Sequence, residues 1–156
     1  MSSMSHVDKA GNVQMVDVGG KEATPRRAVA EGYLRIRPSH QAALGNLPKG
    51  DALTLAQIAG IQGGKRTSDL IPLCHPIALD KLDVRLEVQT GRIRIEAEAR
   101  THAQTGVEME AYTAVAVAGV ALIDMLKGVD PDLTLTDIRL LEKTGGKAPW
   151  RRESAS

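Results

Sequence analysis

The chain has 156 residues, a formal net charge of +1 and 42% apolar residues. This length and composition predict a single globular domain over 1–156 with its own hydrophobic core. Aromatic residues make up only 2% of the chain, and there is no overall basic charge. The stacking side chains and positive field of nucleic-acid-binding proteins are therefore missing. One cysteine excludes an intrachain disulfide and a cysteine-rich zinc site.

The N-terminal residues carry no apolar signal segment. The longest charge-free apolar run, Ala111–Ile123, is shorter than the about twenty residues that cross a bilayer. We therefore expect a cytoplasmic protein with no membrane span. The polar termini are expected to form a flexible arm, about 1–12, and a flexible tail, about 144–156.

The first half of the chain predicts two strands followed by two helices. Alternating apolar residues indicate the strands, and Pro38 ends the second of them. Asp51 or Thr54 begins the second helix and Gly63-Gly64 ends it. The expected bounds are 12–18 and 27–37 for the strands, 41–44 for the first helix and 51–64 for the second. The positions of the expected apolar face of the second helix follow the helical period only loosely. They are Leu55, Ile58, Ala59 and Gln62.

The second half of the chain predicts a β-hairpin, a long helix and a last strand. Leu82–Gln89 and Arg92–Arg100 alternate apolar and polar residues on either side of Thr90-Gly91, which is typical of a hairpin. The last strand is expected over Leu133–Leu141. Strands that include a hairpin, with helices inserted between them, indicate an α+β fold with an antiparallel or mixed sheet.

The long helix is expected over Glu108–Leu126, within outer bounds of 106–127, and its middle is apolar on every side. Such a helix must be buried all round. A sheet can cover one face, but a chain of this length has few elements left for the other. We therefore expect an oligomer with this helix in a subunit interface. A helix sandwiched within one chain stays open as the alternative.

The stretch Lys65–Pro76, which reads KRTSDLIPLCHP, gathers several chemically active side chains in a short space. Its two prolines push Ile71 and His75 toward extended geometry. The stretch is therefore expected to be an irregular loop, where functional groups often lie on a rigid scaffold. The alternative is a buried connector whose polar groups are merely satisfied.

Two further groups of side chains belong to the long helix. Asp124 and Lys127 share a helical face and could form an acid-base pair at the rim of a buried helix. Glu108 and Glu110 lie at the other end, where acidic residues also favour a helix N-terminus. Glu110 and Asp124 would be about 21 Å apart on one straight helix. One small ligand touching both requires either a second subunit or an extended start over 106–109.

Metal-dependent and cysteine-based chemistry are disfavoured. The four histidines form no HExxH pair. Cys74 and His75 are adjacent, so their side chains point apart on an extended segment. They suit neither one metal ion nor a nucleophile with its base. We expect no metal site.

Four stretches of the chain resemble the cyclic pyranopterin monophosphate synthase family, the MoaC family of molybdenum cofactor biosynthesis. They run in order from about Met15 to Lys147 and read MVDVGGKEATPRRAVAEG, KRTSDLIPLCHPIALDKLDV, TGVEMEAYTAVAVAGVALIDMLKGVD and LLEKTGGK. The resemblance implies a ferredoxin-like antiparallel sheet packed against helices. It also implies a hexamer, built as a trimer of dimers.

The family resemblance implies a lyase reaction without metal or cofactor. The substrate is a small molecule, (8S)-3′,8-cyclo-7,8-dihydroguanosine 5′-triphosphate, handed over by an upstream radical GTP cyclase. The products are cyclic pyranopterin monophosphate and diphosphate. Residues that match the family's catalytic positions are Asp124, Lys127 and Lys49. Residues that match its substrate-binding surroundings are Leu73, Cys74, His75, Met109, Glu110, Glu108, Lys65 and Arg26.

Two other classes of function stay open. A homologue without catalysis could bind a pterin or nucleotide, although the complete set of Asp124, Lys127, Lys49 and His75 disfavours it. An unrelated metal-dependent hydrolase would use His75 and Cys74 with nearby acids. Stoichiometric zinc in the purified protein would distinguish the hydrolase.

Overall fold

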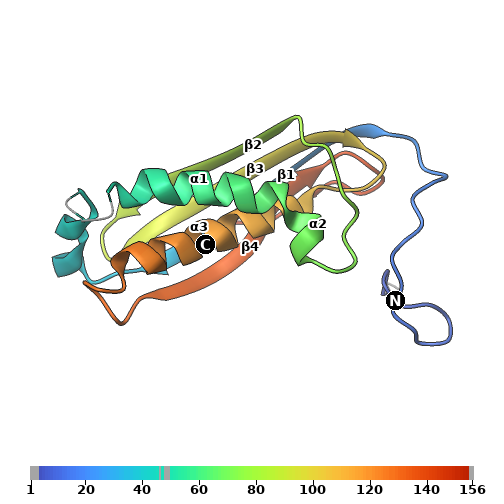
Figure 1. Cartoon of the computed structure of the whole chain (residues 1–156). Helices are drawn as coiled ribbons and strands as arrows, with labels where there is room; N and C mark the ends of the chain where they lie inside the picture. The colour runs from blue at the N-terminus through green and yellow to red at the C-terminus, as the bar shows by residue number, and fades with distance from the viewer. Residues whose placement is uncertain (1–3, 46, 48–49, 155–156) are drawn as a thin grey trace.

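The computed structural model describes residues 4–45, 47 and 50–154. Its architecture is α+β, with two long helices side by side on one face of a sheet (Figure 1). The elements are β1 Thr24–Arg35, the 3-10 helix η1 Pro38–Gly45, α1 Ala52–Lys65, α2 Thr67–Leu70, β2 Lys81–Gln89, β3 Arg92–Ala103, α3 Glu108–Leu126, β4 Thr134–Thr144 and β5 Trp150–Arg151.

The strand order is β2-β3-β1-β4-β5, and every neighbouring pair is antiparallel. The first four strands with α1 and α3 form the β-α-β-β-α-β arrangement of ferredoxin-like folds. The predicted fold class is therefore confirmed. The second strand and the last strand of the prediction correspond to β1 and β4, and the predicted long helix has the same bounds as α3.

The β2–β3 hairpin is confirmed. Gln89 pairs with Arg92 across a two-residue turn, and Gly91 in that turn has a φ of 77°. Glycine adopts this left-handed conformation without the steric strain that a side chain would add. β3 continues past the hairpin and pairs with β1 along its whole length, which places the two strands in the middle of the sheet.

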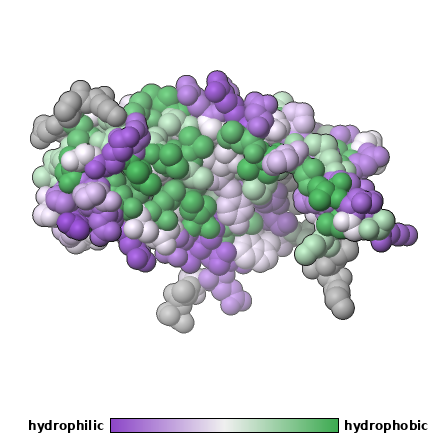
Figure 2. Space-filling model, turned by 60° about the horizontal axis from the view of Figure 1, so that its bottom comes forward, coloured by the Kyte–Doolittle hydropathy of each residue, from purple (hydrophilic) through white to green (hydrophobic). Residues whose placement is uncertain are grey.

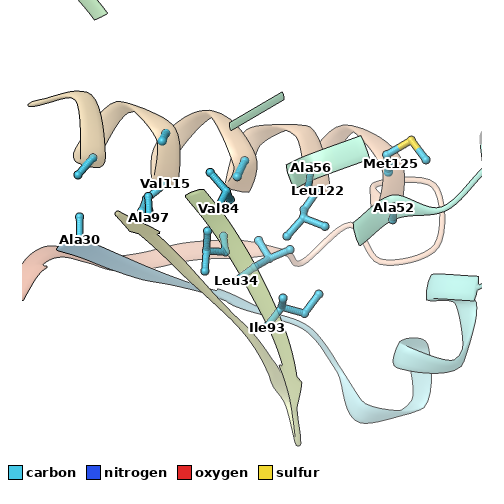
Figure 3. Packing of buried hydrophobic residues seen from close by; sticks show 14 of the residues in the cluster. Ala30, Leu34, Ala52, Ala56, Val84, Ile93, Ala97, Val115, Leu122 and Met125 are labelled. Carbon is cyan, nitrogen blue, oxygen red and sulfur yellow. The ribbon is translucent and has the colours of Figure 1, made fainter. Parts of the chain in front are cut away.

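The core lies between the sheet and the two helices, and it is built largely from small and branched side chains (Figure 3). Ala30 and Ala97 are fully buried on the two central strands, so α3 can lie close to the sheet. Leu34, Ile93 and Leu122 fill the space nearer the C-terminal end of α3. This packing explains how a chain without phenylalanine forms a continuous core.

The helices α1 and α3 pack against each other through their smallest residues. The sequence pattern instead predicted that larger apolar residues form the buried face of α1. Gly60 of α1 is so close to α3 that a Cβ atom there would lie 2.9 Å from the carbonyl oxygen of Ala114. The larger residues Leu55 and Ile58 are 43% and 49% exposed on the other side of α1. The buried face of α1 is therefore the glycine-containing face, which the loose apolar pattern did not indicate.

Two other local expectations are wrong. The strand expected over 12–18 is absent from the described residues, where Val13 forms an isolated antiparallel bridge with Val7. The stretch after Lys65 begins with one helical turn, α2. The hydroxyl of Thr67 donates to the carbonyl oxygen of Gly64 at 2.7 Å, so this side chain keeps the chain turning at the end of α1.

The tail also contains a strand that was not expected. Trp150 and Arg151 form β5, paired with Lys143 and Glu142 of β4. The backbone N–H of Arg152 donates to the carbonyl oxygen of Leu141 at 2.7 Å. The tail therefore extends the edge of the sheet.

α3 is long and apolar enough to cross a membrane by length and composition, but 56% of its apolar window is buried inside the fold. It lies against α1 and against the sheet (Figure 1). The side chain of Val120 remains 60% exposed on the outer surface of the helix layer. Burial within one chain is thus incomplete, and the subunit contact expected for this helix stays a prediction.

The opposite face of the sheet carries charged side chains. Glu31 is only 3% exposed, and its carboxylate accepts hydrogen bonds from Arg94 and Arg139 at 2.8 to 3.2 Å. Glu98 is similarly buried between Arg27 and Arg100. These arginines satisfy carboxylates that would otherwise be costly to bury.

Candidate active site

A cavity of about 270 Å³ lies at the N-terminal end of α3. Three segments that are far apart in sequence form it: the N-terminal arm, the loop before β2 and the start of α3. The lining residues are Ser5, His6, Val16 and Lys21 of the arm, Leu73, Cys74, His75 and Ile77 of the loop, and Thr105, Gly106, Glu108, Met109 and Glu110. Six of the predicted substrate-binding residues are therefore brought together here.

The loop is held in place by hydrogen bonds to the sheet and within itself. Ile71 is extended before Pro72, with φ −109° and ψ 110°, as the proline predicts. The N–H of Cys74 donates back to the carbonyl oxygen of Ile71 at 3.2 Å. Thr101 of β3 donates its hydroxyl to the carbonyl oxygen of Ala78 at 2.6 Å. Anchored at both ends, the loop presents its side chains to the cavity.

Glu110 is the most perturbed acid in the cavity. Its side chain lies in the first turn of α3 and is 4% exposed. Burial, supported by the negative charge of Glu108, raises the pKa of Glu110 from 4.5 to about 7. A carboxyl group with this pKa exchanges protons near neutral pH, which is what general acid-base catalysis requires.

Cys74 faces the same acid and is not activated. Burial and the charge of Glu110 both raise the pKa of the Cys74 thiol. A thiol with a raised pKa is a poor nucleophile at neutral pH. Cys74 therefore lines the cavity as an uncharged thiol, in agreement with the expectation that it is no nucleophile.

Glu108 is fixed by a partner that the sequence did not indicate. Its carboxylate lies 3.2 Å from the ammonium group of Lys143 in β4. A Cβ atom on Gly106 would be 2.1 Å from the same carboxylate, so only glycine leaves room for this orientation. Met109, between the two acids, is 37% exposed at the cavity rim.

Lys65 and Arg26 do not line this cavity. Lys65, the last residue of α1, lines a neighbouring hollow of about 350 Å³ that shares Ile77 with the cavity. Arg26 lies on β1, where Gly146 packs directly on its guanidinium group. The Nε atom of Arg26 is buried and has no hydrogen-bond partner among the described residues. The same guanidinium group donates through its Nη2 atom to the carbonyl oxygen of Gln104 at 3.5 Å.

Asp124 and Lys127 lie at the opposite end of α3. Their side chains are 55% and 63% exposed, and Nζ of Lys127 lies 2.8 Å from Oδ1 of Asp124. α3 is helical from Glu108 onward. An extended start over 106–109, considered above, therefore does not bring Glu110 closer to Asp124. Glu110 and Asp124 remain about 21 Å apart along the helix.

Lys49, the third predicted catalytic residue, lies outside the described residues. Its neighbour Asp51 caps α1 by accepting a hydrogen bond from the N–H of Leu53 at 3.1 Å, which confirms one of the two predicted starts of this helix. α1 begins at the same end of the helix layer at which α3 ends (Figure 1).

Sequence reasoning missed several polar residues of the cavity: His6, Lys21 and Thr105 from the lining and Lys143 behind it. Lys21, Thr105 and Lys143 had a signal, because each belongs to one of the four stretches that resemble the family. His6 had none, since only folding brings the arm to the start of α3. Among the residues that the structure describes, no three His, Cys, Asp or Glu side chains form a group that could hold a metal ion.

Comparison with known proteins identifies the family. The MoaC family profile matches residues 15–146. Three curated relatives are each named cyclic pyranopterin monophosphate synthase. The protein from Roseiflexus sp. (strain RS-1) is 49% identical over 152 residues, covering 95% of this chain and 96% of the relative. The Desulfovibrio desulfuricans protein is 52% identical over 151 residues, covering 94% and 93%. The Rhodospirillum rubrum protein is 53% identical over 149 residues, covering 93% and 90%. This chain therefore belongs to the MoaC family.

Proposed function

We propose that this protein is a cyclic pyranopterin monophosphate synthase, a lyase that acts in molybdenum cofactor biosynthesis. Its substrate would be 3′,8-cyclo-7,8-dihydroguanosine triphosphate, delivered by a radical GTP cyclase in the cytoplasm. The observation that carries this proposal is that relatives of this name are about half identical to the chain over nearly its whole length. The chemistry of the cavity supports it.

The reaction needs two kinds of groups. Formation of the cyclic phosphate joins a hydroxyl oxygen to the first phosphorus, breaks the bond to diphosphate and releases a proton. Cations stabilise the departing diphosphate, a role for Lys65, His75 and Arg26. Rearrangement of the ring needs an acid and a base, and we assign these to Asp124 and Lys127. Lys49 would act on the ring or the departing phosphate.

Glu110 supports acid-base chemistry at the other end of the helix. Its pKa of about 7 lets it hold or release a proton at neutral pH. Leu73, Cys74 and Met109 would form the wall around the pterin rings. Glu108, held by Lys143 at 3.2 Å, would orient the polar edge of the substrate.

The separation of the two groups along α3 supports a site shared by two chains. Val120 and the α1 residues Leu55 and Ile58 are 60%, 43% and 49% exposed, and Figure 2 shows a broad apolar area over the helices. Two copies that stack these faces with their α3 helices antiparallel would bring Glu110 of one chain toward Asp124 of the partner chain. A two-fold axis repeats the contact and forms two sites. Three such dimers would make the hexamer.

Turnover tests the proposal directly. The cyclised GTP intermediate is generated enzymatically and supplied in chelator-treated buffer, and diphosphate and the pterin product are followed by mass spectrometry. We expect turnover by the wild type and a loss of at least about a hundredfold in kcat for Asp124→Ala, Lys127→Ala and Lys49→Ala. Binding without turnover would indicate a pterin-binding module instead. Activity that requires added zinc would indicate a metal-dependent hydrolase.

A further inference from the structure

Asp130 is the most buried carboxylate among the described residues, although it follows α3 in a surface turn. Only 1% of it is exposed. Its two oxygens have separate partners: Oδ1 accepts from the N–H of Asp132 at 2.9 Å, and Oδ2 accepts from the N–H of Arg37 at 3.2 Å. Nδ1 of His40 lies 3.0 Å from Oδ2, without an aligned hydrogen bond to it.

These contacts tie three segments together. The N–H of Asp130 donates to the carbonyl oxygen of Leu126 at 2.9 Å, so the backbone is fixed to the last turn of α3. Its side chain is fixed to Arg37 and His40, at the junction of β1 and η1. The His40 contact and the Asp132 N–H hold the pKa of Asp130 at about 2. The carboxylate is therefore ionised at neutral pH.

The turn that Asp130 fixes is the one that carries Lys127. Lys127 ends α3, with its N–H donating to the carbonyl oxygen of Ile123 at 2.8 Å. Its ammonium group is exposed and reaches Asp124. Since Lys127 and Asp130 lie in the same turn, anchoring the turn also fixes where the Lys127 side chain starts.

We propose that Asp130 is a positioning residue for the reaction. By joining the end of α3 to the corner between β1 and η1, it fixes the direction from which Lys127 approaches the substrate. This inference rests on the proposed function. It adds a group that would act on turnover without touching the substrate.

The test is a kcat and KM comparison of wild type and Asp130→Asn, each folded by circular dichroism and of the same oligomeric size. An amide of the same shape keeps one acceptor and loses the other. Small displacements of a catalytic group lower the rate of the chemical step more than substrate binding. We therefore expect kcat to fall about tenfold or more and KM to stay within about twofold.

Glu31→Gln is the matched control, because Glu31 is also a buried carboxylate but lies on the sheet face opposite to the helices. It should lower the melting temperature and leave kcat unchanged. If Asp130→Asn changes only the melting temperature, as the control does, Asp130 is structural and the inference is wrong. If Asp130→Asn does not fold, His40→Ala replaces it, because this variant removes one contact of Asp130 and keeps both backbone donors. His40→Ala should lower kcat by about threefold at constant KM. An unchanged kcat in this variant would overturn the inference. An inactive wild type would instead refute the proposed function.

Discussion

Glu110 shows how one buried side chain connects stability with chemistry. It lies in the first turn of α3, where the helix N-terminus favours a negative charge. Burial of the side chain outweighs this effect and raises the pKa of Glu110 to about 7. Burying an ionised carboxylate without a cationic partner is unfavourable. The raised pKa of Glu110 therefore costs stability at a pH at which the carboxyl group ionises.

This balance predicts an unusual dependence of stability on pH. The unfolded chain loses the Glu110 proton near pH 4.5, whereas the folded chain keeps it to about pH 7. The free energy of unfolding should therefore fall as the pH rises through this window and level off above it. Glu110→Gln stays neutral, so its advantage over wild type should grow from near zero at pH 4 to a few kcal/mol, at most on the order of 3, at pH 8.

The measurement is denaturant unfolding of both proteins at several pH values and one protein concentration, since association also stabilises the fold. Glu31→Gln serves as control. Burial raises the pKa of Glu31, but the contacts with Arg139 and Arg94 outweigh burial and lower the pKa below its usual value. That variant should be less stable than wild type at pH 8. A difference between wild type and Glu110→Gln that is independent of pH would contradict a raised pKa.

At the scale of elements, the helix pair is organised by glycine. Gly60, Gly63 and Gly64 give α1 a face without side chains, against which Ala114 and Val117 of α3 pack. Glycine in a helix interior is unfavourable by about 1 kcal/mol relative to alanine. The close approach of the two helices, which brings α3 down onto the sheet, accounts for this sequence choice.

Gly60→Ala should therefore destabilise the protein although alanine is the better helix former. The new Cβ would lie 2.9 Å from the carbonyl oxygen of Ala114 and 3.0 Å from the Cβ of Ala118, and neither atom belongs to a flexible side chain. We expect a loss of about 1–3 kcal/mol in the free energy of unfolding. Gly45→Ala, where nothing lies within 4 Å, should change stability by less than about 0.5 kcal/mol. Equal effects at both positions would refute this account of the helix contact.

At the scale of the whole molecule, the candidate catalytic groups occupy two regions. Glu110 and the loop residues surround the cavity at one end of α3, and Asp124 with Lys127 occupies the other end. The surface between them is apolar where Val120 is exposed. In the antiparallel dimer proposed above, a single chain would contribute half of each of two sites.

Mixed oligomers test this arrangement. Glu110→Ala and Asp124→Ala should each be nearly inactive alone. When both chains are co-expressed with different tags and the mixed oligomer is purified, one site of each mixed dimer contains no substitution. Turnover should therefore return to about half of the wild-type rate per mixed dimer.

In the control, one chain carries both substitutions and is co-expressed with the wild-type chain in the same way. Each site of such a mixed dimer then contains one substituted residue, so no site is complete and no turnover is expected from it. Val120→Glu in both chains should prevent recovery by burying a charge in the contact. If separately inactive chains show no recovery in a stable mixed oligomer, each site is built within one chain.

The elements could be predicted from sequence where local rules decide them. Alternation identified β1 and the β2–β3 hairpin, and the uninterrupted apolar run identified α3. The last strand was expected over Leu133–Leu141, close to the bounds of β4. The rules failed where a tertiary contact overrides them. The exposed side of α1 carries Leu55 and Ile58, and at the junction of α1 and α2 the Thr67 hydroxyl donates to the carbonyl oxygen of Gly64. The short strand β5 exists only because β4 offers an open edge.

The candidate site divides in the same way. The family motifs can be recognised from residue identity and short spacing, and they point to Asp124, Lys127 and the loop residues Leu73 to His75. The raised pKa of Glu110, about 7, and the contact of Lys143 with Glu108 arise only in the folded chain. Burial and long-range pairing depend on which segments the fold brings together, and sequence spacing does not contain that information.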